Sequence, residues 1–157
     1  MTPAEHSTPI QPRHVLGRNG EHSPTRHGES LDLCLSALRA RRWHMWAYGN
    51  DPVQAFGATL TWPHVVDMII LWSPATALAY RTPRHPDTDP YCPTHVTGHY
   101  TGPALWATRW LLTITPPGNT LSALRPVGPD FAALLEMRLH PEKTWVPLPP
   151  PGPSDSR

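Results

Sequence analysis

The sequence predicts an α+β fold, in which a four-stranded antiparallel β-meander over residues 43–81 is covered by two to three helices. Three observations support this prediction. Residues 43–81 alternate between two faces with the period of two that is typical of strands. Turn residues divide the stretch into runs joined by a few residues, which favours antiparallel pairing because parallel crossovers need a dozen or more. Apolar residues at helical spacing lie before and after it in the chain.

The first predicted element is a helix over residues 31–41. Leu31, Leu35 and Leu38 recur at helical spacing, and Ser30 precedes them as an N-cap whose hydroxyl can accept a backbone N–H. Basic residues gather in the last turn, where they interact favourably with the helix dipole.

Four strands follow this helix. The second, residues 55–62, alternates most clearly, and the third, residues 65–72, is apolar on both faces except at Asp67. A strand of the latter kind is expected at the centre of a sheet that is covered on both sides. With unbroken alternation, one face of the sheet can carry small residues that let a helix pack closely. These small residues are Ala55, Gly57, Ala77 and Ala79.

The region after the meander is predicted to contain a long loop and two further elements. Residues 82–102 form the loop, and a loop of this length in a compact domain is either functional or disordered. A helix is expected over residues 103–114, apolar nearly all round and therefore buried against the sheet. Residues 130–139 have helical spacing too, with a strand ending near Leu139 as the alternative.

Proline marks the limits of the folded part. It accounts for 22 of the 157 residues, about three times its usual share, but only three prolines lie within residues 31–81. Because proline interrupts helices and sheet ladders, we expect a disordered Pro/His-rich arm over residues 1–28. A single domain over residues 29–146 and a Pro-rich disordered tail over residues 147–157 complete the predicted organisation.

Several features predict a soluble, cytoplasmic protein without a membrane partner. The first residues lack a basic stretch followed by an apolar run, so no signal peptide is expected. The longest uncharged run of the meander is shorter than the about 20 residues that a bilayer requires. Cys34 and Cys92 are the two cysteines, and we expect reduced thiols rather than a disulfide framework.

Basic residues provide a candidate nucleic-acid site. Arg39, Arg41 and Arg42 are followed by Trp43 and Trp46, and guanidinium groups with nearby aromatic rings can bind phosphates and stack on bases. The alternative is a basic helix C-terminus followed by core tryptophans. The net charge of +1 is too small to indicate a nucleic-acid partner, so none is expected.

The candidate metal site is Cys92, His95 and His99, which have the spacing C-x2-H-x3-H within the long loop. Thiolate and imidazole groups are natural zinc ligands, and this spacing lets three of them converge from one loop. Structural zinc sites usually bring a second Cys or His pair, which this sequence lacks. Loop residues without a metal are therefore the alternative, and zinc is the candidate cofactor against an expectation of no cofactor.

Catalytic residues are not identified by the sequence. His44, His64 and Asp67 could meet across neighbouring strands, and a histidine–carboxylate pair is the minimum for general acid–base chemistry. No recognisable turn places a serine or cysteine nucleophile beside them, and a structural hydrogen-bonded pair is the alternative.

These observations favour a non-enzymatic interaction or accessory module that binds an unidentified protein partner. The excess of tryptophan is typical of interfaces, although most of these residues are expected in the core. The alternative function is a zinc-binding protein or small metal-dependent hydrolase that uses the loop containing Cys92, His95 and His99.

Overall fold

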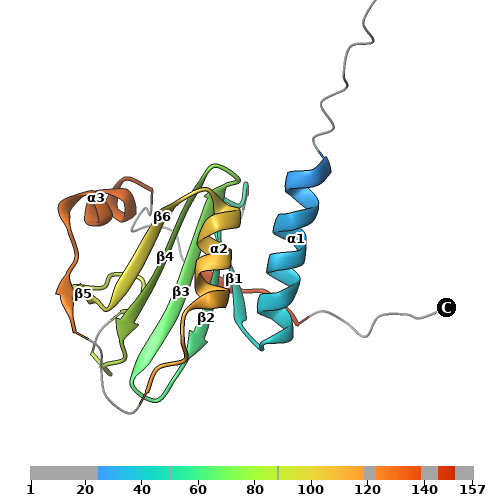
Figure 1. Cartoon of the computed structure of the whole chain (residues 1–157). Coiled ribbons are helices and arrows are strands. Elements are labelled where there is room, and N and C mark those ends of the chain that lie inside the picture. Colours follow the sequence, from blue (N-terminus) through green and yellow to red (C-terminus); the bar gives the residue numbers. More distant parts are fainter. Residues whose placement is uncertain (1–24, 50, 88, 119–122, 139–144, 151–157) are drawn as a thin grey trace, which may run out of the picture.

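Residues 25–49, 51–87, 89–118, 123–138 and 145–150 are described in a computed structural model of the chain. Within these ranges, three helices and a largely antiparallel β-structure confirm the predicted α+β class (Figure 1). In chain order the elements are α1 Thr25–Ala40, β1 His44–Tyr48, β2 Ala55–Thr61, β3 Val65–Ser73, β4 Thr76–Pro83, β5 His95–Val96, β6 Gly98–Gly102, α2 Ala104–Thr113, β7 Arg125–Pro126, α3 Pro129–Arg138 and β8 Trp145–Pro147. Most of the predicted amino-terminal arm, and residues 151–157 of the predicted tail, lie outside the described residues.

The main sheet has six strands among the described residues, in the spatial order β6-β4-β3-β2-β1-β8, and every neighbouring pair is antiparallel. Strands β1 to β4 form the predicted meander. The sequence did not predict the two outer strands, β6 next to β4 and β8 next to β1. β6 contains two glycines and β8 ends in a proline, so pairing with a neighbour rather than local propensity makes them strands.

Helices α1 and α2 lie on one face of the main sheet (Figure 1). Beneath α2, Ala77 and Ala79 of β4 are fully buried in the same core cluster as Ala104 and Ala107 of the helix. Small residues on both sides allow the helix backbone to approach the sheet closely. α2 is buried against the sheet, as predicted, but through one side only, since Trp106 on the other side is 54% exposed although the helix is apolar nearly all round.

The predicted face of small residues is only half present. Ala77 and Ala79 lie under α2, but Ala55 and Gly57 lie on the opposite face, where the ring of Trp145 covers Gly57. In the observed register Ala58 pairs with Ile69, and Ile69 pairs with Ala79, so the β2 residue on the α2 face is Ala58 and not Gly57. Alternation within each strand does not determine this register, so the error could not be detected from the sequence.

The opposite face of the sheet has its own core. Met68, Ile70, Leu78 and Tyr80 are fully buried there, in one core cluster with residues of α3 and of the chain that follows β4. α3 confirms the helical interpretation over the strand alternative for residues 130–138, and Leu139 lies outside the described residues. The predicted loop over residues 82–102 is shorter than expected, since β4 extends into it and β5 and β6 occupy its second half.

Helix α1 is longer than predicted. It begins at Thr25, inside the predicted arm, so Ser30 lies within the helix and is not its N-cap. Leu38 is fully buried, as the apolar stripe predicts, whereas Leu33 on the outer side is 72% exposed. In the part of the chain that the structure describes, no helix has the length and apolar character needed to cross a membrane.

Candidate functional site

The three predicted zinc ligands lie in different surroundings. Cys92 is exposed in a turn, where its backbone N–H donates to the carbonyl oxygen of Asp89 at 2.9 Å. His95 begins β5 and is exposed. His99 lies in β6, and its ring meets the ring of Phe131 in α3 edge-on at 5.5 Å between centroids.

The described residues contain no group of three or more His, Cys, Asp or Glu placed to hold a metal ion. In addition, partial burial and the nearby Asp89 carboxylate raise the pKa of the Cys92 thiol, which disfavours the thiolate that zinc requires. The geometry of the described residues therefore gives no support to the candidate zinc site at Cys92, His95 and His99.

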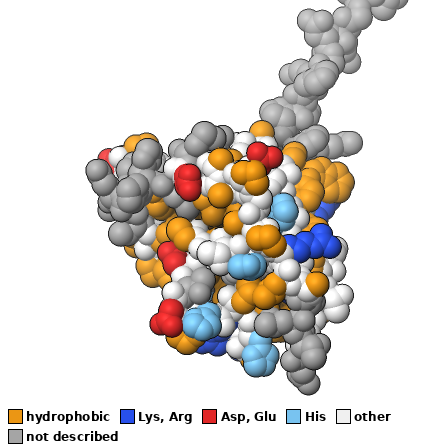
Figure 2. Space-filling view, turned by 90° about the vertical axis from the view of Figure 1, so that its left-hand side faces the viewer, with side chains coloured by type: hydrophobic (Ala, Val, Ile, Leu, Met, Phe, Trp, Pro, Cys, Tyr) orange, Lys and Arg blue, Asp and Glu red, His pale blue; other side chains and the backbone are white. Residues whose placement is uncertain are grey.

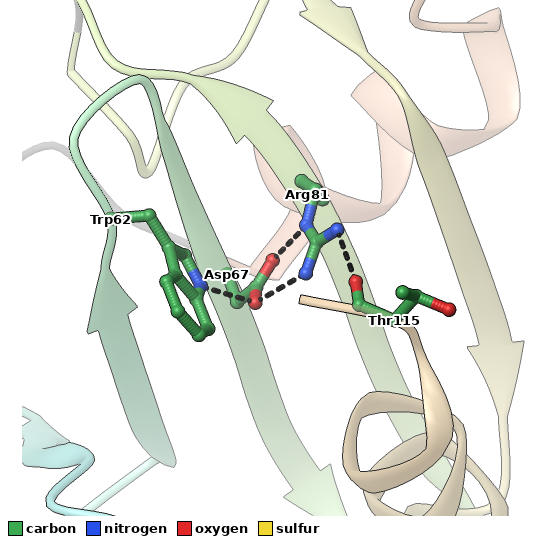
Figure 3. A network of polar contacts seen from close by, with 4 residues as sticks. All are labelled: Trp62, Asp67, Arg81 and Thr115. Carbon is green, nitrogen blue, oxygen red and sulfur yellow. Dashed lines mark hydrogen bonds and ion pairs between the residues drawn. The ribbon is translucent and has the colours of Figure 1, made fainter. Parts of the chain in front are cut away.

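The candidate histidine–carboxylate pair does not form around Asp67. This side chain is almost fully buried on β3, where it accepts a hydrogen bond from Trp62 Nε1 at 2.8 Å and forms a two-bonded ion pair with Arg81 (Figure 3). Arg81 also donates to the carbonyl oxygen of Thr115, just after α2. Both carboxylate oxygens are occupied, so Asp67 joins the sheet to the end of α2 and is not available to a histidine.

The basic cluster at the end of α1 has a defined conformation. The N–H of Arg42 donates to Arg39 O at 2.9 Å, and the N–H of Trp43 donates to Leu38 O at 3.2 Å. This pattern of hydrogen bonds is the Schellman motif, in which the residue after the helix has a left-handed conformation and is usually glycine. Here that residue is Arg42, with φ of 62°. A larger residue in this conformation is strained, and strained residues are frequent at functional sites.

The structure separates the three arginines into two groups. Arg41 donates from Nη1 to the carbonyl oxygen of Leu112 at 2.9 Å and so ties α1 to α2. The side chains of Arg39 and Arg42 are exposed, and neither forms a hydrogen bond or ion pair with the described residues. Of the predicted cluster, Arg39 and Arg42 are therefore the two that can bind an external anion.

Arg39 and Arg42 line an open groove of about 620 Å³, which we call the β1-edge groove. Its lining residues are Arg39, Arg42, Trp43, His44, Met45, Trp46, Pro147, Leu148, Pro149 and Pro150. The groove arises where the carboxy-terminal segment leaves the sheet. The N–H of Leu148 still donates to Met45 O at 2.8 Å, but the prolines that follow have no N–H with which to continue the ladder.

Trp145 anchors this carboxy-terminal segment to the face of the sheet that lies away from α1 and α2. Its ring covers Gly57, lies 5.1 Å from the ring of Tyr48 and is stacked on the ring of Tyr91 at 4.6 Å. Residues 147–150, expected to be part of a free tail, therefore follow the edge of β1 and form one wall of the groove.

The chain between β4 and β5 forms a second hollow, on the same face as Trp145. Tyr80 donates its hydroxyl to Pro90 O at 2.7 Å, and Thr82 donates to His95 O at 3.0 Å, so β4 holds the second half of the loop and the start of β5. Burial, followed by the nearby Tyr91, raises the pKa of Tyr80, which therefore remains a neutral donor. Between loop and sheet lies an open cavity of about 460 Å³, which we call the loop pocket.

The residues lining the loop pocket are Trp46, Thr59, Thr61 and Val66 from the sheet side and Pro83, Arg84, His85, Pro86, Pro90 and Tyr91 from the loop side. Trp46 lines both the loop pocket and the β1-edge groove. On the face of the molecule that carries α3 and β5, Figure 2 shows histidine side chains exposed among hydrophobic ones. The sequence indicated the long loop as a candidate site, but the partners that it meets on the sheet depend on tertiary packing.

Comparison with protein-family models, with curated proteins and with solved structures finds no match to this chain.

Proposed function

We propose that this protein is a non-enzymatic interaction module, and that the β1-edge groove binds an extended acidic segment of a protein partner. The observation that carries the proposal is that the Arg39 and Arg42 guanidinium groups, on the wall of an open and largely apolar groove, form no hydrogen bond or ion pair with the described residues. Guanidinium groups without a counter-charge favour a partner that supplies carboxylates, with which they form strong, often two-bonded contacts.

Charge complementarity supports this choice of partner. Among the described residues, none that lines the groove carries a carboxylate, and the exposed imidazole of His44 adds a further donor. Most of the remaining lining is apolar and includes Met45 and Leu148. A segment that alternates acidic and apolar side chains would match both the charge and the apolar surface.

The conformation of Arg42 provides an independent argument. A non-glycine residue in the left-handed region costs about 1–2 kcal/mol, and glycine would avoid this cost. An arginine at this position carries that cost while its side chain contacts no partner in the described chain. A role for the guanidinium in binding would explain why this left-handed position holds an arginine rather than a glycine.

Selection from a library of short random peptides, with the full-length protein as bait, tests the proposal. The expected result is enrichment of Asp and Glu next to apolar residues, and loss of this enrichment with the double variant Arg39→Ala/Arg42→Ala. Arg109→Ala is the matched control, because Arg109 is exposed on α2 over the ring of Trp106 and away from the groove.

Two results would overturn the proposal. One is selection of the same peptides by the wild type and by the double variant. The other is binding of single-stranded oligonucleotides more tightly than any selected peptide, with the same dependence on Arg39 and Arg42, since the groove would then be a nucleic-acid site.

A further inference from the structure

The loop pocket has the size and composition of a small-molecule site. Its volume of about 460 Å³ lies within the range of roughly 300–1,000 Å³ that is usual for such sites. We propose that it binds a small ligand that joins a planar aromatic body to a carboxylate. Of the described residues, the pocket shares only Trp46 with the β1-edge groove, so this inference does not depend on the proposed function.

Two aromatic rings in the wall of the pocket, those of Trp46 and Tyr91, are held in position before any ligand binds. Trp46 is oriented by the hydrogen bond from its Nε1 to Thr59 Oγ1 at 3.2 Å. Tyr91 is held from the loop side by stacking on Trp145, with ring centroids 4.6 Å apart and planes inclined by 19°. Rings fixed before binding lose little conformational entropy when a ligand contacts them, and they favour a flat apolar partner.

The polar groups around the pocket are mainly donors. Thr59 is 6% exposed and its oxygen accepts from Trp46, while its own hydroxyl proton has no acceptor within the described residues. The exposed Arg84 side chain also forms no hydrogen bond or ion pair with these residues. Donors without acceptors select a ligand that brings acceptor oxygens, and a carboxylate satisfies a guanidinium best.

The two acidic side chains near the pocket have other partners and do not pair with these donors. Asp87 lies beside the His85 imidazole, with its Oδ2 3.7 Å from Nδ1. Asp89 accepts from the backbone N–H of Tyr91 at 2.8 Å and is not part of the lining. Within the described part of the chain, the Arg84 guanidinium therefore has no counter-charge.

Two-dimensional ¹H–¹⁵N spectra of the full-length protein test this proposal, with 2-naphthoate and its neutral amide, 2-naphthamide, as matched probes. The signal of the Trp46 indole N–H is assigned with the variant Trp46→Phe and then followed during each titration. The expected result is a dissociation constant of about 1 mM or tighter for 2-naphthoate, and binding weaker by about tenfold for 2-naphthamide.

The variant Arg84→Ala should bind 2-naphthoate about tenfold more weakly, as weakly as the wild type binds 2-naphthamide, because the charge-assisted hydrogen bond between the guanidinium and the carboxylate is lost. Arg109→Ala removes an equal charge from α2 and leaves both affinities unchanged. The proposal is overturned if 2-naphthoate does not shift the Trp46 signal at about ten times the predicted dissociation constant. Equal binding of the two probes, or an unchanged affinity in Arg84→Ala, would overturn it as well.

Discussion

Replacement of Arg42 by glycine should stabilise the protein while weakening its binding of an acidic partner. Arg42 has φ of 62°, and the left-handed conformation costs a non-glycine residue about 1–2 kcal/mol. Glycine removes this cost, but it also increases the conformational entropy of the unfolded chain, which lowers the free energy of unfolding by about 0.4–1 kcal/mol. The Arg42 side chain forms no hydrogen bond or ion pair with the described residues, so none is lost. The net expectation is a free energy of unfolding higher by about 0.5–1 kcal/mol.

Urea unfolding followed by far-UV circular dichroism measures this difference, provided that the dependence on urea is the same for all variants. Arg42→Ala serves as the control, because it removes the guanidinium and keeps the left-handed strain. Its free energy of unfolding should be within about 0.5 kcal/mol of the wild type. An Arg42→Gly variant that is less stable than Arg42→Ala would refute the reasoning, since glycine would then not relieve strain at this position.

Three further changes test the core on both faces of the sheet. Asp67→Asn leaves the largely buried guanidinium of Arg81 without its counter-charge, so the free energy of unfolding should fall by about 3–5 kcal/mol. A loss below about 1 kcal/mol in urea unfolding would show that the fold does not need this ion pair. Tyr91→Phe removes a buried hydroxyl that has no hydrogen-bond partner among the described residues, so stability at neutral pH should be equal or higher by about 1 kcal/mol. Burial, followed by Asp89, raises the pKa of Tyr91 in the folded state, so its contribution to stability is complete below the unfolded pKa of about 10 and is lost as pH rises beyond it. Unfolding measured between about pH 9 and 11 should therefore show a smaller alkaline loss in Tyr91→Phe than in the wild type, and equal losses would contradict this assignment. Gly57→Ala would place a Cβ 2.8 Å from the ring of Trp145 and should cost about 1–3 kcal/mol, whereas Gly128→Ala, where a Cβ meets nothing within 4 Å, should be neutral in the same thermal-unfolding experiment.

The order and type of the central elements could be predicted because their patterns are local. Alternation over β1 to β4 and short connections determine the meander, and Asp67 was visible as the polar exception in an apolar strand. The role of Asp67 was not visible, since its partner Arg81 comes from the neighbouring strand and Trp62 from the preceding turn. Such contacts depend on register, which a single sequence does not specify.

The candidate sites show the same limit. The sequence located the basic cluster, but it could not distinguish Arg41, which binds the end of α2, from Arg39 and Arg42, which line the groove. The far wall of that groove comes from residues 147–150, a proline-rich stretch with no strand signal of its own. The signal that could have indicated this segment is Trp145, a large aromatic residue two positions before the first of these prolines.

A coupling measurement between the protein and a selected acidic peptide tests the central claim most directly. Affinities are measured for wild type and Arg42→Ala, each with the peptide and with its Glu→Gln counterpart, by fluorescence anisotropy on the full-length protein. If a peptide carboxylate contacts Arg42, the four values should give a coupling free energy of about 1.5 kcal/mol or more. Arg109→Ala should give a coupling near zero in the same cycle. A coupling near zero for Arg42 as well, with peptide affinity otherwise retained, would contradict the account, because the acidic segment would then bind elsewhere on the protein.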